Sequence, residues 1–260
     1  MKNYVNLIVI VLSLVIGYTI YYMILGNPDN FLDPLIKHEP KPGNILGTIY
    51  TGGPLVGLLM SLIIISVAFV FERFLSINKA KGKSNPETFI VSVVKDLEKG
   101  DLDSALTKCD KQRGSVANIL RSAISRFKDI ENDPEFVGEK KLTEVQRSID
   151  EAINLETPLL EKNLVVLSTV ASIATMVGLL GTTLGMIRAF QALAVSGTVS
   201  AIQLSIGISE ALYNTAGGLI GAILSIVAFN FFTTKVDNFV YMIDEAVLNI
   251  MQIFTIRIKK

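Results

Sequence analysis

The 260-residue sequence is 50% hydrophobic and 18% charged, and its formal net charge is zero. So apolar a composition is typical of an integral membrane protein, and a chain without a basic surplus is a poor partner for nucleic acid. Because Cys109 is the only cysteine and His38 the only histidine, one chain offers no disulfide framework, no zinc cluster and no histidine-activated nucleophile. We therefore expect no metal and no cofactor, and we interpret Cys109 as a packed or idle thiol and His38 as a solvated side chain.

Four apolar stretches are long enough to cross a bilayer, which takes roughly 20 helical residues. In chain order they cover about residues 4–25, 54–71, 164–187 and 199–234. An Asn-Pro-Asp-Asn turn follows the first stretch. A Gly-Gly-Pro turn opens the second, with proline in the first helical turn, where its missing N–H is tolerated. The sequence thus predicts four transmembrane helices.

The first apolar stretch has two interpretations. A positive residue before an apolar core is also found in signal peptides. This run is longer than a signal-peptide core, however, and no small-x-small cleavage site follows it. Tyr18, Tyr21 and Tyr22 form the aromatic belt expected where a retained helix leaves the membrane. We therefore interpret the stretch as a retained anchor.

The distribution of lysine and arginine predicts the orientation of the chain. Residues 79–162 contain fifteen of them and the tail from residue 235 contains four, whereas residues 26–48 contain two and residues 191–204 contain none. Positive residues stay on the cytoplasmic side of a membrane. The 79–162 segment, the tail and both termini are therefore expected inside, and the other two connections outside.

The 79–162 segment is balanced in charge and reads as a set of amphipathic helices. Asp101 and Ser115 are expected N-caps of two of them, and Thr143 with Gln146 has the pattern of a capping box at the start of a third. Pro158 predicts a bend or a break in the helix that leads toward the third span. The segment is expected to be a small cytoplasmic helical domain.

The expected fold is an all-α membrane protein. Its segments in chain order are a membrane helix at 1–25, an external loop at 26–53, a membrane helix at 54–78, the cytoplasmic helical domain at 79–162, a membrane helix at 163–190, an external loop at 191–198, a membrane helix at 199–234 and a cytoplasmic tail at 235–260.

Glu210 is the only acidic or basic residue between Ala189 and Thr234. A charge at membrane depth costs roughly 2.5–3.5 kcal/mol or more, so carboxylates there are rare and usually functional. An acid shielded from water can be loaded and unloaded with a proton at cellular pH, as a relay residue requires. The alternative is a neutral glutamic acid that only bonds another helix. Bulk solvent around Glu210, or a permanent cation against it, would contradict the relay.

Small and polar residues accompany Glu210 at intervals of three or four, which places them on one helical face. In the fourth span they are Gly207, Asn214, Gly217, Gly221 and Ser225, and in the third span they are Gly178, Gly181 and Gly185. Such a stripe is either a helix-packing seam or the lining of a narrow hydrated space or a guest-helix site. Thr182 and Thr215 lie beside it, although threonine in a membrane helix often bonds only its own helix. Neither glycine run has the Lys-Ser/Thr pair of a nucleotide loop.

Two runs point to a family. Gly-Leu-Leu-Gly-Thr-Thr-Leu-Gly-Met-Ile-Arg-Ala-Phe at 178–190 and Gly-Ile-Ser-Glu-Ala-Leu-Tyr-Asn-Thr-Ala-Gly-Gly-Leu at 207–219 resemble the signature helices of the ExbB/TolQ branch of the MotA/TolQ/ExbB proton-channel family. The resemblance covers roughly residues 54–240. The sequence departs from it at Ile206 and Leu224, where family members often carry proline, and in the additional first span.

The resemblance implies a proton-driven motor subunit of the bacterial inner membrane. Family members form a pentameric ring around the membrane helices of an ExbD or TolR dimer, and they energise TonB or TolA. Matched by position, Glu210 corresponds to the family's pore glutamate, and Thr215 and Thr182 to threonines of the proton pathway. The ExbB-like role in TonB-dependent uptake is favoured over the TolQ-like role.

Other functions are possible for such a chain. A non-conducting scaffold would recruit partners through its cytoplasmic helices, and within the family a stator of a flagellar or gliding motor is the nearest competitor. Sodium coupling needs several oxygen ligands, and the spans offer few. An intramembrane hydrolase would need a nucleophile with a base, or paired aspartates, which the spans do not contain. An enzyme is therefore not expected.

Overall fold

The computed structural model describes residues 2–33, 39–196 and 201–259. His38 and the end of the predicted 191–198 loop lie outside them. The elements of the described residues are all helices, with no strand among them, which confirms the all-α prediction. The chain divides into two compact units. We call Met1–Phe71 with Asn163–Asn230 the membrane unit, and Glu72–Lys162 with Phe231–Lys260 the helical unit.

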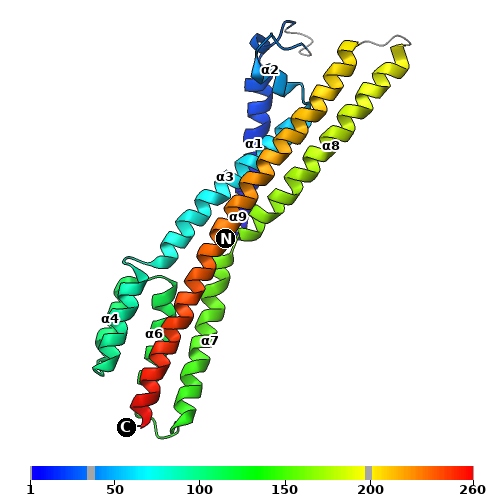
Figure 1. Cartoon of the computed structure of the whole chain (residues 1–260). Helices are drawn as coiled ribbons and strands as arrows, with labels where there is room; N and C mark the ends of the chain where they lie inside the picture. Colours follow the sequence, from blue (N-terminus) through cyan, green and yellow to red (C-terminus); the bar gives the residue numbers. More distant parts are fainter. Residues whose placement is uncertain (1, 34–38, 197–200, 260) are drawn as a thin grey trace. The chain divides into compact units, whose positions relative to one another are not determined.

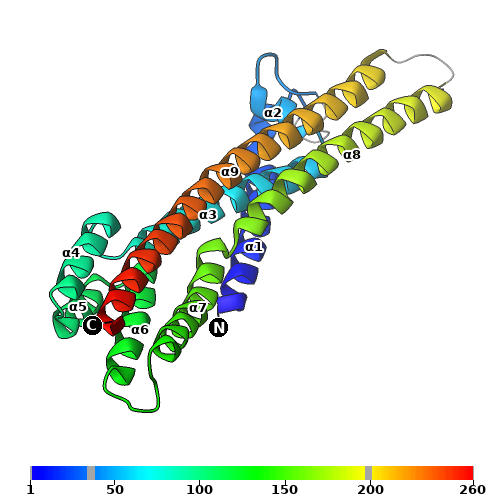
Figure 2. The same cartoon turned by 60° about the horizontal axis from the view of Figure 1, so that its bottom comes forward.

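Among the described residues, four helices are long and apolar enough to cross a membrane, as the sequence predicted. The helices of the membrane unit, some of which continue beyond it, are α1 (Lys2–Thr19), its π-helical extension η1 (Ile20–Leu25), the short η2 (Pro28–Asn30), α2 (Ile45–Tyr50), α3 (Pro54–Lys81), α8 (Leu164–Ser196) and α9 (Ala201–Lys259). In both views α8 and the first part of α9 lie side by side (Figures 1 and 2).

Large apolar side chains cover the outward faces of these helices. They include Leu7, Ile8, Val11 and Val15 on α1, Met176, Leu179 and Leu180 on α8, and Leu219, Ile220 and Ile223 on α9. Soluble proteins rarely expose so large an apolar surface. These faces fit lipid or the apolar surface of another protein chain.

α9 continues from the fourth span through the predicted tail as one helix of 59 residues. The sequence after Gly221 contains neither glycine nor proline, so no residue there interrupts the backbone hydrogen bonds. The expected division at residue 234 therefore marks a change in polarity within one helix.

The helical unit comprises α4 (Pro86–Glu98), α5 (Leu102–Gln112), α6 (Ser115–Ile130) and α7 (Glu139–Glu161), with the end of α3 and the last part of α9. Its core consists of fully buried apolar side chains, among them Val93, Ile119, Ile124, Ile149 and Ile250. Phe127 of α6 stacks on Phe254 of α9 with ring centroids 4.1 Å apart. Burial of these side chains stabilises the unit as in any globular helical domain.

The predicted helix signals of this unit had mixed outcomes. Asp101 is an N-cap and accepts a hydrogen bond from the Ser104 amide, as predicted. Ser115 is instead the first helical residue after Gly114. Thr143 lies inside α7, where its hydroxyl bonds the Glu139 carbonyl. The capping-box prediction was therefore wrong.

α7 also runs through Pro158 and ends at Glu161. The break lies at Lys162 and Asn163, where Asn163 has a φ of 66°, close to the left-handed region that asparagine tolerates. The sequence thus predicted an interruption of this helix about one turn too early.

Candidate functional site

Glu210 is buried in the membrane unit, with 7% of its surface exposed. One carboxylate oxygen, Oε1, accepts a hydrogen bond from Nη1 of Arg188, which lies on the neighbouring helix α8. The Arg188 side chain is 53% exposed, against 9% for that of Glu210. The carboxylate is therefore enclosed, while its counter-ion reaches the surface of the protomer.

The backbone at Gly53 closes the site next to this ion pair. A Cβ built on Gly53 would lie 2.7 Å from Oε1 of Glu210 and 3.4 Å from Nη1 of Arg188. Gly53 also has a φ of +80°, a conformation that glycine adopts without strain. Only glycine combines this backbone with such a close approach to the carboxylate.

Asn214 lies one helical turn after Glu210 and is fully buried. Its Nδ2 donates to the carbonyl oxygen of Gly52 at 2.7 Å and to that of Glu210 at 3.0 Å. Its Oδ1 is buried and has no hydrogen-bond partner among the residues that the structure describes. A buried acceptor without a hydrogen bond costs free energy. Packing alone therefore does not require a polar side chain such as that of Asn214 beside Glu210.

The glycines of α8 lie at its contact with α9. A built Cβ would be 3.1 Å from the Asn214 carbonyl oxygen at Gly178, 2.2 Å from the Asn214 Cβ at Gly181, and 2.8 Å from the Gly207 carbonyl oxygen at Gly185. At Gly181 and Gly185 these distances leave no room for a Cβ, and at Gly178 the neighbouring backbone would have to shift by a few tenths of an ångström. Within one protomer these positions thus form a helix-packing seam, and a pore-lining role in a ring stays a prediction.

The other stripe residues on α9 also contact neighbouring helices. They pair as Gly217 with Leu59, Gly221 with Ala174 and Ile63, and Ser225 with Ser66, whose hydroxyl oxygens are 2.5 Å apart. The close approach that small residues allow therefore joins α3, α8 and α9 along the turns of α9 that follow Glu210.

The two threonines bond main-chain carbonyls. The Thr182 hydroxyl donates to Leu179 of its own helix at 2.6 Å. The Thr215 hydroxyl lies 3.3 Å from the Ala211 carbonyl oxygen and 3.4 Å from that of Gly178 on α8. Thr215 thus lies at the seam, and the proton-pathway role of both residues stays a prediction.

Sequence reasoning missed Arg188 and Gly53 as neighbours of Glu210. A signal for Arg188 was present, because it follows Gly178, Gly181 and Gly185 at the same interval and so continues their helical face. No comparable signal existed for Gly53, since its contact with Glu210 depends on how the segment before α3 folds back.

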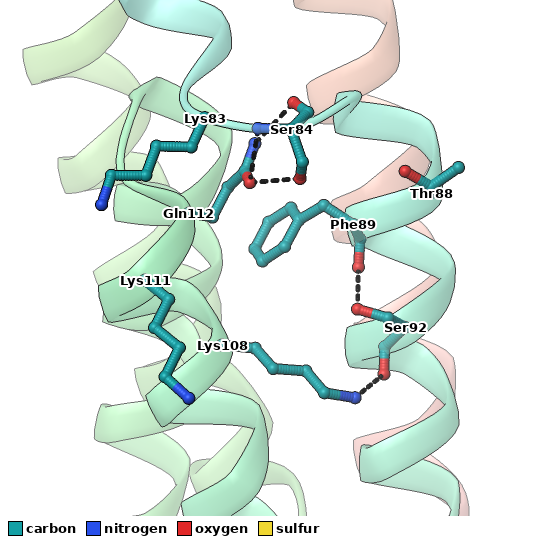
Figure 3. A pocket seen from close by; sticks show the side chains of 8 residues that line it. All are labelled: Lys83, Ser84, Thr88, Phe89, Ser92, Lys108, Lys111 and Gln112. Carbon is teal, nitrogen blue, oxygen red and sulfur yellow. Dashed lines mark hydrogen bonds between the residues drawn. The ribbon is translucent and has the colours of Figure 1, made fainter.

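The helical unit contains a separate pocket of about 380 Å³ along α4 and α5. Figure 3 shows the Gln112 amide against Ser84 and the Lys108 amine reaching the Ser92 carbonyl. Gln112 also donates to the carbonyls of Lys81 and Ser84 at 3.1 and 2.8 Å. The polar groups of Gln112 thus hold the segment that follows α3 against α5. This role is structural.

Cys109 lies in the same unit and is 2% exposed. Burial, together with the negative charge of Asp110, raises the pKa of its thiol to about 12. Since the thiolate is the reactive form of cysteine, this geometry fits a packed thiol.

Comparison with known proteins places these features in context. The family model described as "MotA/TolQ/ExbB proton channel family" matches residues 111–245. A biopolymer transport protein ExbB homolog of Methanothermobacter thermautotrophicus is 26% identical over 208 residues, which are 80% of this chain and 68% of that protein.

Two further relatives carry the names of the two branches. TolQ of Pseudomonas aeruginosa is 33% identical over 137 residues, 50% of this chain and 59% of TolQ. ExbB of Aquifex aeolicus is 44% identical over 77 residues, 30% of this chain and 52% of ExbB. This chain thus spans little more than half the length of these two relatives. With the family match covering more than half of its residues, the chain belongs to the MotA/TolQ/ExbB proton channel family.

Proposed function

We propose that this chain is the proton-conducting subunit of an inner-membrane motor that uses the proton motive force to energise a TonB- or Tol-type system. Relatives named ExbB and TolQ support both possibilities, and we favour the ExbB-like role. The bias of lysine and arginine toward residues 79–162 supports an orientation with both termini in the cytoplasm.

The enclosure of Glu210 within the membrane unit carries this proposal. A carboxylate that is 7% exposed, next to an Asn214 Oδ1 that has no hydrogen-bond partner among the described residues, has the setting of an intramembrane proton carrier. In this proposal Glu210 accepts and releases the proton, and Thr182 and Thr215 polarise the path.

The Arg188–Glu210 pair bears directly on the relay. A carboxylate held permanently by a guanidinium cannot take up a proton, so the pair has to open in each cycle. The 53% exposure of the Arg188 side chain supports such opening, because water or another carboxylate can reach the guanidinium without unpacking the helices. We propose that the pair is one state of the relay.

Assembly follows from the same proposal. The exposed apolar faces of α8 and α9 supply surface on which protomers associate in a membrane. We propose a homopentameric ring around the membrane helices of an ExbD- or TolR-like dimer, acting on a TonB- or TolA-like protein.

Proton flux through the reconstituted complex tests the proposal. The full chain is co-expressed with its expected partner, a short protein whose single N-terminal span bears an aspartate, and the complex is placed in sodium-free liposomes containing a pH-sensitive dye. Glu210→Gln keeps the size of the side chain but removes titration, so flux should fall to the level of empty liposomes. Glu245→Gln is the control, since Glu245 is an exposed carboxylate later on the same helix.

Undiminished flux in Glu210→Gln would overturn the relay and favour the non-conducting scaffold. Arg188→Gln separates a working pair from a permanent lock. If the wild type does not conduct and Arg188→Gln does, the pair is a lock, and the relay proposal fails for this chain. Flux that requires sodium would replace the proton with sodium as the coupling ion.

A further inference from the structure

The outer end of the N-terminal helix contacts the segment that precedes α3. Tyr21, on the π-helical extension η1, is 3% exposed. Its ring stacks on that of Tyr50 with centroids 4.6 Å apart and planes 17° apart, and its hydroxyl donates to the Tyr50 carbonyl at 3.3 Å. Tyr50 is the last residue of α2.

The same carbonyl fixes the turn that touches the proton site. The Tyr50 carbonyl oxygen also accepts from the Gly53 amide at 3.0 Å. A Cβ on Gly53 would then meet Oε1 of Glu210 at 2.7 Å. An unbroken series of direct contacts therefore leads from Tyr21 through Tyr50 and Gly53 to Glu210.

The segment between η1 and α3 is fastened at a second place. Nδ2 of Asn30 donates to the carbonyls of Ile24 and Leu25, at 2.9 Å each. Oδ1 of Asn30 accepts from the Asn44 side chain at 3.0 Å, and Asn44 caps α2. These bonds tie α2, and with it the turn after Tyr50, to the end of the N-terminal helix.

α1 is itself packed closely on α3. A Cβ on Gly17 would lie 2.1 Å from Oγ of Ser61, and a Cβ on Gly57 would lie 2.9 Å from the ring of Tyr18. A helix that serves only as an anchor needs an apolar face toward lipid, which Val11 supplies at 51% exposure. Anchoring does not require a buried tyrosine stack or these polar bonds at its outer end.

We propose that the N-terminal helix holds a cover over the proton site: η1 and α2 press the Gly52–Gly53 turn against Glu210, with Tyr21 and Tyr50 as positioning residues. This inference rests on the proposed function, since it assigns the cover to the relay carboxylate. The cover keeps Glu210 from the water on the side of the 26–53 segment. That side is the external one in the proposed orientation.

Side-specific chemical labelling tests the cover. A water-soluble carbodiimide is added to the full-length protein, assembled with its partner, in right-side-out and in inverted membrane vesicles, and the modification of Glu210 is followed by mass spectrometry. In Tyr21→Ala the stack and the hydroxyl bond are lost together, so labelling from the external side should rise about tenfold. Tyr21→Phe keeps the stack and should stay within about threefold of the wild type.

Three controls exclude trivial causes. Met23→Ala changes a residue that is 72% exposed on the same helical segment and should label like the wild type. Glu210→Gln removes the labelled group. Cys109, which is buried in the helical unit, should stay unreactive toward a maleimide unless the protein unfolds.

Labelling of Tyr21→Ala within twofold of the wild type, or rising equally from both sides, would overturn the cover. Protection of Cys109 excludes unfolding of the helical unit, and a rise in labelling confined to the external side excludes a general loosening of the membrane unit. If Tyr21→Ala does not fold, Tyr21→Phe is compared with Met23→Ala instead. The relay is tested separately, because retained flux in Glu210→Gln rejects proton carriage whatever the labelling shows.

Discussion

The membrane unit and the helical unit surround their ion pairs differently. In the membrane unit the carboxylate of Glu210 has a 9% exposed side chain and lies among glycine backbones. In the helical unit several pairs face water, as in Arg147–Glu151, whose side chains are 71% and 65% exposed. Exposed pairs contribute little to stability because water already solvates both charges. The buried carboxylate of Glu210 depends on its contact with Arg188 and on the shape of the packing around it.

The comparison also separates two ways of holding helices together. The helical unit buries large side chains such as Phe127 and Phe254 and gains stability from removing them from water. In a membrane, lipid is as apolar as the side chains, so close backbone approach takes over. Gly178, Gly181 and Gly185 provide that approach. Charge and packing are thus independent at the exposed pairs of the helical unit and coupled at Glu210.

The sharpest exception in the helical unit is Arg73, whose side chain is 1% exposed. It donates to both Glu72 carboxylate oxygens at 2.7 Å and to the Leu160 carbonyl at 3.1 Å. Arg73→Ala would orphan that buried carbonyl and leave a cavity, so we expect a loss of about 2–4 kcal/mol in the free energy of unfolding.

Urea-dependent protease sensitivity of the full chain would measure this loss. Arg147→Ala removes an arginine from an exposed pair and should cost less than about 1 kcal/mol. Equal costs for the two variants would mean that burial does not distinguish the ion pairs of this unit.

The glycine seam provides the next largest effect. At Gly181 a Cβ would lie 2.2 Å from the Cβ of Asn214, whereas at Gly217 the nearest atom, in Leu59, is 3.4 Å away. Gly181→Ala should therefore separate α8 from α9 and lower stability by about 1–3 kcal/mol, with a matching loss of proton flux. Gly217→Ala makes an ordinary contact and should be tolerated.

Thermal unfolding in detergent and flux in liposomes would compare the two glycine variants. A stable, fully conducting Gly181→Ala would show that the seam is looser than the structure describes.

Much of this architecture could be predicted from the sequence. The apolar runs marked the four spans because their length and lack of charge are demanded by the bilayer, and Glu210 stood out as the lone charge of its span. The N-caps of the helices were predicted less accurately. Asp101 was identified correctly. Thr143 was not, since threonine also occurs inside helices, bonded to the preceding turn, and Ser115 was not, because Gly114 takes the cap position before it.

The parts that could not be predicted depend on tertiary contacts. Gly53 reaches Glu210 only because Tyr21 and Asn30 fasten the intervening segment to the first helix, and no periodicity records such a contact. Arg188 was open to prediction from its interval with Gly185, yet its pairing with Glu210 required the register between α8 and α9.

The smallest expected effect concerns Asp96, which links α4 to α5 in the helical unit. Hydrogen bonds from Lys108 and then from Ser104 hold the pKa of its carboxyl below the usual value. A carboxylate whose pKa is lowered by folding stabilises the fold above its ordinary pKa of about 3.9 and loses that contribution as the pH falls further. Hydrogen exchange of the α4 and α5 amides in the full chain, corrected for intrinsic rates, should therefore show opening that becomes easier below about pH 4. Because the Lys108 side chain is 36% exposed, the pH-dependent difference in the free energy of opening should stay below about 1 kcal/mol.

Asp96→Asn should flatten this pH dependence, whereas Asp110→Asn, in a pair whose side chains are more than half exposed, should change it less. An unaltered slope in Asp96→Asn would place the acid sensitivity elsewhere and leave burial, not ionic contact, as the main link between α4 and α5.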